Sequence, residues 1–243
     1  MDTPYKTTTN TYSHTSVPWQ QNILNDFLKK TGIHKDASCI DTGTGIGNNL
    51  STLLKYCDQV AAVDVSESAL KILQERYSKN LDQITIKKMD ARYLDYPSAS
   101  FDLVVYTEML EHCLKPQDVL DECIRILRPG GCLVLSGPNY FNPAGIVKII
   151  RENIYPRKTW DAWGNHDAGI ENFLTSFKIK KWAAKLRLDI INDRGGDLIR
   201  SWLPFFRQYY KIIDCYPCLT IGRRWPLKML MMNYFVLARK RIN

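Results

Sequence analysis

The sequence lacks any long hydrophobic segment. No run of eighteen apolar residues occurs among its 243 residues, so we expect no membrane-spanning helix. It also lacks a linker rich in glycine, serine and proline, an internal repeat and a low-complexity segment, which excludes repeat architectures and favours one folded domain. The first twenty residues are polar and rich in threonine, without the apolar centre of a secretory signal.

Cysteines are few and odd in number, seven in all, which argues against a disulfide framework. Five fall in or beside expected strands and helices, where a free thiol acts as a small hydrophobic side chain: Cys39, Cys57, Cys113, Cys123 and Cys132. Cys215 and Cys218 form a C-x-x-C pair without a second pair of ligands, so we interpret them as ordinary thiols. Free thiols suit a reducing compartment, and we expect a cytoplasmic protein.

The glycine-rich turn after the first expected strand carries the most information. The run is Cys39-Ile40-Asp41-Thr42-Gly43-Thr44-Gly45-Ile46-Gly47, with a helix expected from about Asn48. A second apolar strand, residues 60–63, ends at Asp64. A glycine turn lets a ligand lie against bare backbone, and a carboxylate at the tip of the next strand can accept hydrogen bonds from both ribose hydroxyls. The pattern predicts a nucleoside-containing cofactor at the carboxyl edge of a parallel sheet.

The spacing of the glycines indicates which cofactor this is. A dinucleotide site has G-x-G-x-x-G with a pyrophosphate at the helix start, whereas Asn48 stands at the third glycine position here. Asp41, two residues before the first glycine, repels a pyrophosphate and attracts an ammonium group. A nucleoside with a cationic amino-acid tail describes S-adenosylmethionine, and the pattern resembles the first motif of class I S-adenosylmethionine-dependent methyltransferases.

The resemblance extends over about residues 36–139. Further expected strands are 84–89, 101–105 and 132–136, the last after a tight turn at 128–131. The stretch Thr107-Glu108-Met109-Leu110-Glu111-His112, with Leu127-Arg128-Pro129-Gly130-Gly131 after it, is similar to the type 11 group and its ubiquinone-biosynthesis O-methyltransferase branch. The resemblance implies a Rossmann-like α/β fold, a seven-stranded, mostly parallel sheet with helices on both faces and an antiparallel edge strand.

The resemblance also implies cofactor-binding residues and an arrangement of the chain. The cofactor residues are Asp41, Gly43, Thr44, Gly45, Gly47, Asp64, Val65, Asp90, Ala91 and Thr107, with Asp90 and Ala91 at the adenine. We expect one methyltransferase domain over 1–243, made of a cap (1–35), a cofactor-binding core (36–139) and a substrate-side insertion with the last strands (140–243).

Segments outside the core are expected to form the walls of the site. An amphipathic helix is expected at 20–31, and Tyr12, His14 and Trp19 before or at its start are candidates to shield the sulfonium; alternatively Trp19 packs the helix start. Later helices are expected at 145–152, at 177–188 with a cap at Thr175-Ser176, and at 202–213. The last strands are expected at 188–192 and 229–238.

Three roles are open for the acidic segment after the fourth strand. His112 and Glu108 are the candidate catalytic residues, because a general base for a hydroxyl acceptor would have to lie at this edge. If the segment begins a helix, Glu108, Glu111 and His112 share a face and could hold a divalent cation, with His166 as a further ligand. The third role of His112 is structural, and we predict no metal site.

The expected reaction is methyl transfer to a small, mostly apolar or aromatic acceptor, at a hydroxyl oxygen. Alternatives are an RNA 2′-hydroxyl methyltransferase using a divalent metal, suggested by the net charge of +8, and a non-catalytic S-adenosylmethionine-binding protein. A nicotinamide dehydrogenase is disfavoured by Asn48 and Asp41. We expect no nucleic-acid partner, because no RNA-binding module accompanies the charge. Peripheral contact with a membrane stays open.

Overall fold

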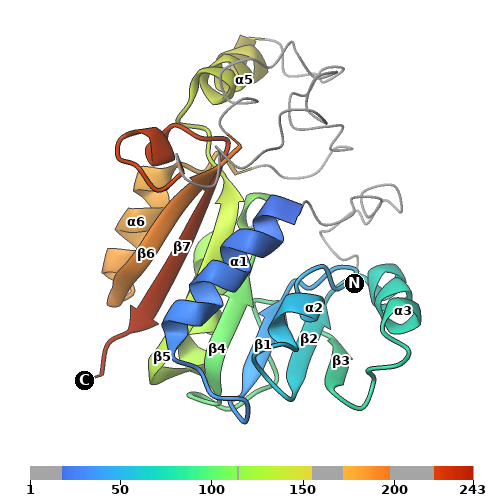
Figure 1. Cartoon of the computed structure of the whole chain (residues 1–243). Coiled ribbons are helices and arrows are strands. Elements are labelled where there is room, and N and C mark those ends of the chain that lie inside the picture. Colours follow the sequence, from blue (N-terminus) through green and yellow to red (C-terminus); the bar gives the residue numbers. More distant parts are fainter. Residues whose placement is uncertain (1–17, 114, 155–171, 198–221, 243) are drawn as a thin grey trace.

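Seven strands form a single sheet in the computed structural model, which describes residues 18–113, 115–154, 172–197 and 222–242 (Figure 1). The strands are β1 (Cys39–Thr42), β2 (Val60–Asp64), β3 (Ile84–Lys88), β4 (Phe101–Tyr106), β5 (Leu127–Pro138), β6 (Leu188–Gly196) and β7 (Asn233–Lys240). Their order is β3-β2-β1-β4-β5-β7-β6. The first five pair in parallel, whereas β7 is antiparallel to both β5 and β6, with β6 outermost. The predicted mostly parallel α/β sheet with an antiparallel edge is confirmed.

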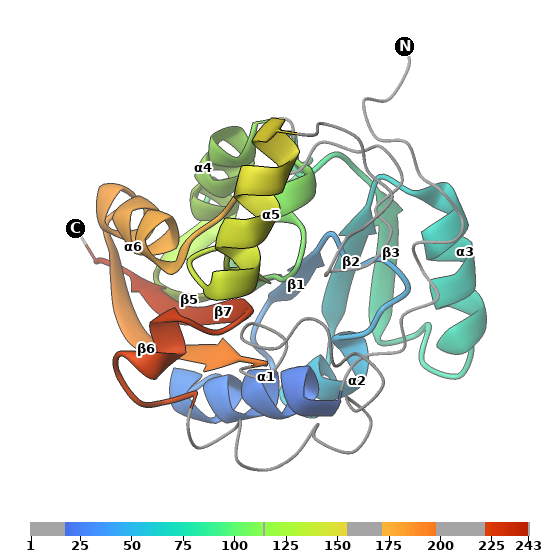
Figure 2. The ribbon, with the colours of Figure 1, turned by 90° about the horizontal axis from the view of Figure 1, so that it is seen from above.

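Helices cover both faces of this sheet (Figure 2). They are α1 (Pro18–Thr31), α2 (Leu50–Leu53), α3 (Glu67–Arg76), α4 (Pro116–Ile126), α5 (Pro143–Ile154) and α6 (Ser176–Lys185), with short 3₁₀ turns η2 (Leu110–His112) and η4 (Leu227–Met229). Alternation along β5 creates two cores, because successive side chains point to opposite faces. Leu133 packs with α4 and α6, while Cys132 and Val134 pack with α1, α2 and α3.

Helix α1 forms as its periodicity predicts. Its buried face consists of Ile23, Leu24, Phe27 and Leu28. Trp19, at its start, makes an edge-on contact with Phe235 of β7, with ring centroids 5.7 Å apart. A Cβ added to Gly196 of β6 would lie 2.3 Å from the Trp19 ring. The structure therefore supports the packing role of Trp19; Tyr12 and His14 lie outside the described residues.

Several boundaries differ from the expected ones. Helix α2 has only one helical turn and begins at Leu50 instead of about Asn48, because Gly47, Asn48 and Asn49 still belong to the glycine-rich loop. Strand β5 begins at Leu127 and includes the residues expected as a turn, since a register shift between Phe101 and Leu103 on β4 accommodates them. Strand β6 extends to Gly196, and β7 begins after η4.

Helices α5 and α6 confirm the expected ones, and Thr175 caps α6 by accepting a hydrogen bond from Lys178 N. The helix expected at 202–213 lies outside the described residues.

The expectation that Cys39 and Cys57 are free thiols is wrong. Cys39 opens β1, Cys57 follows α2, and the two form a disulfide across 18 positions of sequence. Their Cα atoms lie 6.7 Å apart, within the usual reach of such a bond. The pairing arises because the chain between them turns back against the start of β1, which an odd cysteine count does not reveal. Cys113, Cys123 and Cys132 are free and buried.

No described helix has the length and apolar character needed to cross a bilayer. The cytoplasmic location stays a prediction.

Candidate functional site

The carboxylate of Asp41 is the centre of a polar cluster at the ends of β1 and β4. Thr44 Oγ1 donates to one of its oxygens at 2.8 Å, and Asn49 Nδ2 donates to the other at 3.1 Å. The same amide nitrogen donates to Thr107 Oγ1 at 2.9 Å. Asn49 therefore links the glycine-rich turn to the residue that follows β4. It was not among the predicted site residues, and its only signal was its place two positions after the third glycine.

Burial governs the acidity of Asp41. The side chain is almost completely inaccessible, and desolvation raises the pKa of its carboxyl group to about 6. The hydrogen bonds from Thr44 and Asn49 oppose this rise, and the nearby charge of Asp64 adds to it. A cationic ligand beside Asp41 would favour the ionised form, because an opposite charge stabilises it.

Asp41→Asn should therefore stabilise the ligand-free protein at neutral pH. The pKa is raised from 3.8 in the reference state, so the contribution of Asp41 to stability is fully present below that value and is lost as the pH rises through about 6. The neutral amide removes that loss, and we expect the free energy of unfolding at neutral pH to rise by about 2–3 kcal/mol. Denaturant titrations across this pH range measure it, with the exposed Asp82→Asn as control. Equal pH dependence in Asp41→Asn and the parent would contradict the assignment.

Asp64 lies at the end of β2 and faces the same turn. Its two oxygens accept hydrogen bonds from Gly45 N and Ser66 N, both at 2.8 Å. Burial raises its pKa, and these backbone hydrogen bonds oppose the rise. A carboxylate offers about four acceptor positions, so these backbone contacts leave capacity to accept from a ribose hydroxyl. Val65 follows directly and is half-buried.

The three glycines of the turn have positive φ angles, as expected for a glycine-rich turn between a strand and a helix. Gly43, Gly45 and Gly47 have φ values of 70°, 55° and 79°, in the left-handed region that glycine occupies at little cost. The thioether of Met109 lies over Gly43, and a Cβ added there would be 1.7 Å from its Sδ. Gly43 itself has no side chain, and only the flexible end of the Met109 side chain lies over its backbone.

Distant side chains hold this turn in place. Tyr77 Oη donates to Gly47 O at 2.8 Å and accepts from Ser51 N at 3.1 Å. Arg76 donates to Asn48 Oδ1 at 2.8 Å. These contacts connect the end of α3 to the turn, and no local sequence pattern predicts them.

Asp90, at the expected adenine position, is paired with an arginine two residues further along the chain. Arg92 forms an ion pair with it at 2.6 Å and donates its backbone N–H to the same carboxylate. Burial alone would raise the pKa of Asp90, but the hydrogen bonds and charge of Arg92 outweigh it and the pKa is lowered. Ala91 between them is buried. An adenine amino group would have to share the carboxylate with Arg92.

Glu108 lies where the ends of β4, β5 and β7 meet. Its carboxylate accepts hydrogen bonds from Ser136 Oγ at 2.7 Å and from Asn233 Nδ2 at 2.8 Å. Its φ is 51°, a left-handed conformation that is uncommon for a residue with a side chain and that often occurs at functional sites. Desolvation raises the pKa of this carboxyl group. Ser136 and Asn233 were not predicted, because neither belongs to a recognisable motif.

The expected helical face of Glu108, Glu111 and His112 does not exist. Glu108 precedes η2, which begins only at Leu110, and its left-handed backbone directs it toward β5 and β7. His112 Nε2 lies 3.8 Å from Glu111 Oε1, and its side chain is 37% exposed. Within the described ranges, no three His, Cys, Asp or Glu side chains gather closely enough to hold a metal ion. His166 lies outside those ranges.

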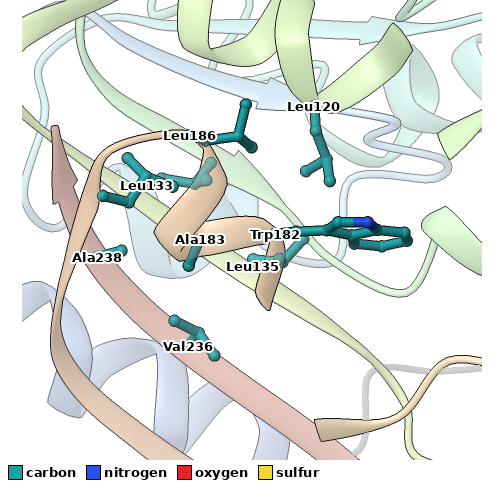
Figure 3. A pocket seen from close by; sticks show the side chains of 9 residues that line it. Leu120, Leu133, Leu135, Trp182, Ala183, Leu186, Val236 and Ala238 are labelled. Carbon is teal, nitrogen blue, oxygen red and sulfur yellow. The ribbon is translucent and has the colours of Figure 1, made fainter. Parts of the chain in front are cut away.

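An apolar cavity of about 10 Å³ lies between α6 and the sheet, and none of the carboxylates described above lines it (Figure 3). Its wall includes Leu133, Leu135, Trp182 and Val236. A space of this size holds about one water molecule and offers it no polar partner, so we interpret it as a packing gap.

Comparisons with known proteins agree with this arrangement. A family described as methyltransferase domain matches residues 40–135. A ubiquinone biosynthesis O-methyltransferase of Cupriavidus pinatubonensis is 27% identical over 165 residues, which cover 64% of this chain and 61% of that relative. The chain thus aligns with less than two thirds of that relative's length.

Solved structures with low sequence identity to this chain share its fold. A geranyl diphosphate methyltransferase in complex with GPP and sinefungin has a TM-score of 0.63 and 16% identity, over 92% of this chain and 77% of that one. The [4+2]-cyclase SpnF has a TM-score of 0.61 and 16% identity, over 93% and 84%. One fold therefore serves more than one activity, and function has to be argued from the site.

Strand order, the glycine-rich turn and the match over residues 40–135 agree with one another: this part of the chain is similar to the core of class I S-adenosylmethionine-dependent methyltransferases. The matched family is the type 11 group that the sequence resembles.

Proposed function

We propose that this protein transfers the methyl group of S-adenosylmethionine to a hydroxyl oxygen of a small, mostly apolar or aromatic acceptor. The observation that carries the proposal is the adjacency of two polar clusters at the carboxyl edge. Thr107 belongs to the cluster around Asp41, and Glu108, the next residue, belongs to the cluster with Ser136 and Asn233. A cofactor held by the first cluster would present its reactive end toward the second.

The first cluster suits each part of the cofactor. Asp41 would attract the ammonium group of its amino-acid tail, and Asp64 would accept hydrogen bonds from the ribose hydroxyls. Gly43 and Gly45 leave the backbone bare for close approach, although Met109 would have to move from Gly43. The pair of Asp90 and Ala91 would lie at the adenine, with Arg92 sharing the carboxylate. These residues fit the group.

The bound cofactor supplies an electrophilic methyl group on a sulfonium, which is transferred by in-line displacement. The protein has to orient the acceptor and remove the hydroxyl proton. Glu108 would accept that proton, since its raised pKa brings its basicity nearer to that required at neutral pH. Ser136 and Asn233 would orient the carboxylate through their hydrogen bonds. His112 is the second candidate, because its partly exposed ring follows in η2.

The apolar or aromatic character of the acceptor rests on the sequence after Asn139, which is rich in tryptophan and tyrosine. The hydroxyl acceptor is supported by similarity to O-methyltransferases such as the ubiquinone biosynthesis O-methyltransferase of Cupriavidus pinatubonensis.

The direct test titrates the protein with S-adenosylmethionine and with NADH by calorimetry. It then follows transfer of a labelled methyl group to catechol-type hydroxyl acceptors and to matched aromatic amines. Binding of S-adenosylmethionine together with labelled hydroxyl products is the expected result. Binding of NADH alone, or transfer to the amines alone, would refute the proposal.

Asp64→Ala should weaken S-adenosylmethionine binding at least tenfold in a folded protein. The change removes two charge-assisted hydrogen bonds to ribose, each of which contributes roughly 1.5–3 kcal/mol. Calorimetry measures the affinity, and the exposed Asp58→Ala serves as the matched control. Because Asp64 also accepts from Gly45 N and Ser66 N, thermal melting is recorded in parallel. Unchanged affinity in Asp64→Ala removes Asp64 from the site.

A further inference from the structure

Asn139, which follows directly after β5, is completely buried and uses every hydrogen-bonding position of its side chain. Its Nδ2 donates to Met229 O at 2.9 Å and to Met231 O at 2.7 Å. Its Oδ1 accepts from Phe141 N at 3.3 Å and from Ser176 N at 3.0 Å. A side-chain amide has two donors and two acceptor lone pairs, so all four positions are satisfied and the orientation of the amide is fixed.

These four contacts join three segments that meet at the carboxyl edge of the sheet. One segment leads into α5, one begins α6, and residues 229–231 precede β7. In Figure 1, β5 passes toward α5 and the segment 222–232 passes into β7 at the same end of the sheet. The backbone N–H of Asn139 adds a fifth contact by donating to Met232 O at 2.6 Å. Asn139 therefore fixes the course of the chain up to the residue before Asn233.

The segment that Asn139 holds leads into one of the two partners of Glu108. Asn233 opens β7 opposite Pro138 of β5, and its Nδ2 donates to the carboxylate of Glu108 at 2.8 Å. A displacement of the Asn233 backbone would withdraw this donor and let the carboxylate rotate about its remaining contact with Ser136. The orientation of the proposed base thus depends on contacts made at the other end of a short segment, residues 229–232.

We propose that Asn139 is a positioning residue for methyl transfer, which holds residues 229–232 so that Asn233 orients the carboxylate of Glu108. The inference rests on the proposed function, because it takes Glu108 as the base. Asn139 acts through Asn233 and not on the acceptor or the cofactor. Displacement of a reacting group by about 1 Å can lower the rate about a hundredfold. A loosened junction should therefore lower turnover more than it weakens substrate binding.

The test is a double-mutant cycle between Asn139→Ser and Asn233→Leu, measured as the kcat of labelled methyl transfer and as the calorimetric affinity for S-adenosylmethionine. Asn139→Ser should lower kcat about tenfold or more and leave the affinity and the KM for the acceptor close to those of the parent. In the Asn233→Leu background, where the donor to Glu108 is already absent, it should cause little further loss of kcat. Losses that multiply in the double variant would overturn the proposal, since Asn139 would then act independently of Asn233.

Asn142→Ala is the matched control for lost stability. Asn142 is buried at the same junction, where its Nδ2 donates to Asn139 O and to Met231 O, and its Oδ1 accepts from Gly145 N at 2.9 Å. Its removal should lower the melting temperature and leave kcat close to that of the parent, because none of these contacts reaches β7. An equal loss of kcat in Asn142→Ala would overturn the proposal. Asn139→Asp, which keeps the two accepted hydrogen bonds, is the second variant. If neither Asn139 variant folds while Asn142→Ala does, Asn139 serves the fold alone and the proposal is wrong.

A second measurement needs no activity. The side-chain amide protons of Asn233 are followed by NMR in the ligand-free protein, and their signal is identified by its loss in Asn233→Leu. Asn139→Ser should accelerate their exchange with water about tenfold or more, because a hydrogen-bonded amide exchanges only when its contact opens. The side-chain amide of Asn49, which donates to Asp41 at 3.1 Å, is the internal control and should not change. Unchanged exchange at Asn233 in a parent that transfers methyl groups overturns this inference alone, whereas a parent without methyl transfer refutes the proposed function and this inference with it.

Discussion

Gly45→Val is expected to abolish binding of S-adenosylmethionine, with an affinity loss of about a hundredfold or more. Gly45 has a φ of 55°, where a β-branched residue is strained, and its N–H donates to Asp64 at 2.8 Å. A valine would displace the turn from both Asp41 and Asp64 and would place a side chain where the cofactor must approach. Isothermal titration calorimetry measures the loss.

Gly32→Val is the matched control for this prediction. Gly32 has a similar φ of 70°, and a Cβ added there has no neighbour within 4 Å. Its valine variant carries comparable backbone strain, of order 1–3 kcal/mol, at a position after α1 that is not part of the turn. Both variants should remain folded, and only Gly45→Val should lose the ligand. Normal titration of Gly45→Val would mean that this turn does not hold the cofactor.

Glu108→Gln is expected to lower turnover by about a hundredfold or more while leaving the affinity for S-adenosylmethionine close to that of the parent. The amide keeps the shape of the side chain but cannot accept a proton, and general base catalysis contributes roughly 10²–10⁴-fold. In the parent, kcat should rise as the pH increases through the raised pKa of Glu108, because the base acts in its ionised form. The variant should lose this dependence.

Two companion variants separate catalysis from folding. Glu122 accepts hydrogen bonds from Leu94 N and Arg125 within α4, so Glu122→Gln should lower stability without altering the turnover of the folded fraction. His112→Ala tests the alternative base. If turnover collapses in His112→Ala and persists in Glu108→Gln, the assignment of Glu108 is wrong.

The parts of the candidate site that the sequence predicts are formed by residues close together in the chain, and most of the parts that it does not predict are formed by residues far apart. Asp41, Gly43, Gly45 and Gly47 lie within seven positions, and their conformations are those that a strand followed by a glycine turn predicts. By contrast, Asn49 and Thr107 are 58 positions apart, and Glu108 and Asn233 are 125 apart. Such pairs meet only because β1, β4 and β5 end, and β7 begins, at a common edge of the sheet. Arg92 beside Asp90 was close in sequence, yet the motif gave no sign that it would occupy the carboxylate.

By itself, the sequence determined the class of fold and the glycine-rich turn, because alternating strands and helices with glycines after the first strand are local patterns of burial and backbone freedom. The tertiary structure alone decided the antiparallel insertion of β7 between β5 and β6, the disulfide of Cys39 and Cys57, and the direction of Glu108 away from His112. It also decided that the apolar stripe of α5 faces outward, since periodicity shows that a helix has an apolar side but not what that side meets. Periodic hydrophobicity encodes burial one element at a time, whereas these features depend on which distant elements pack together.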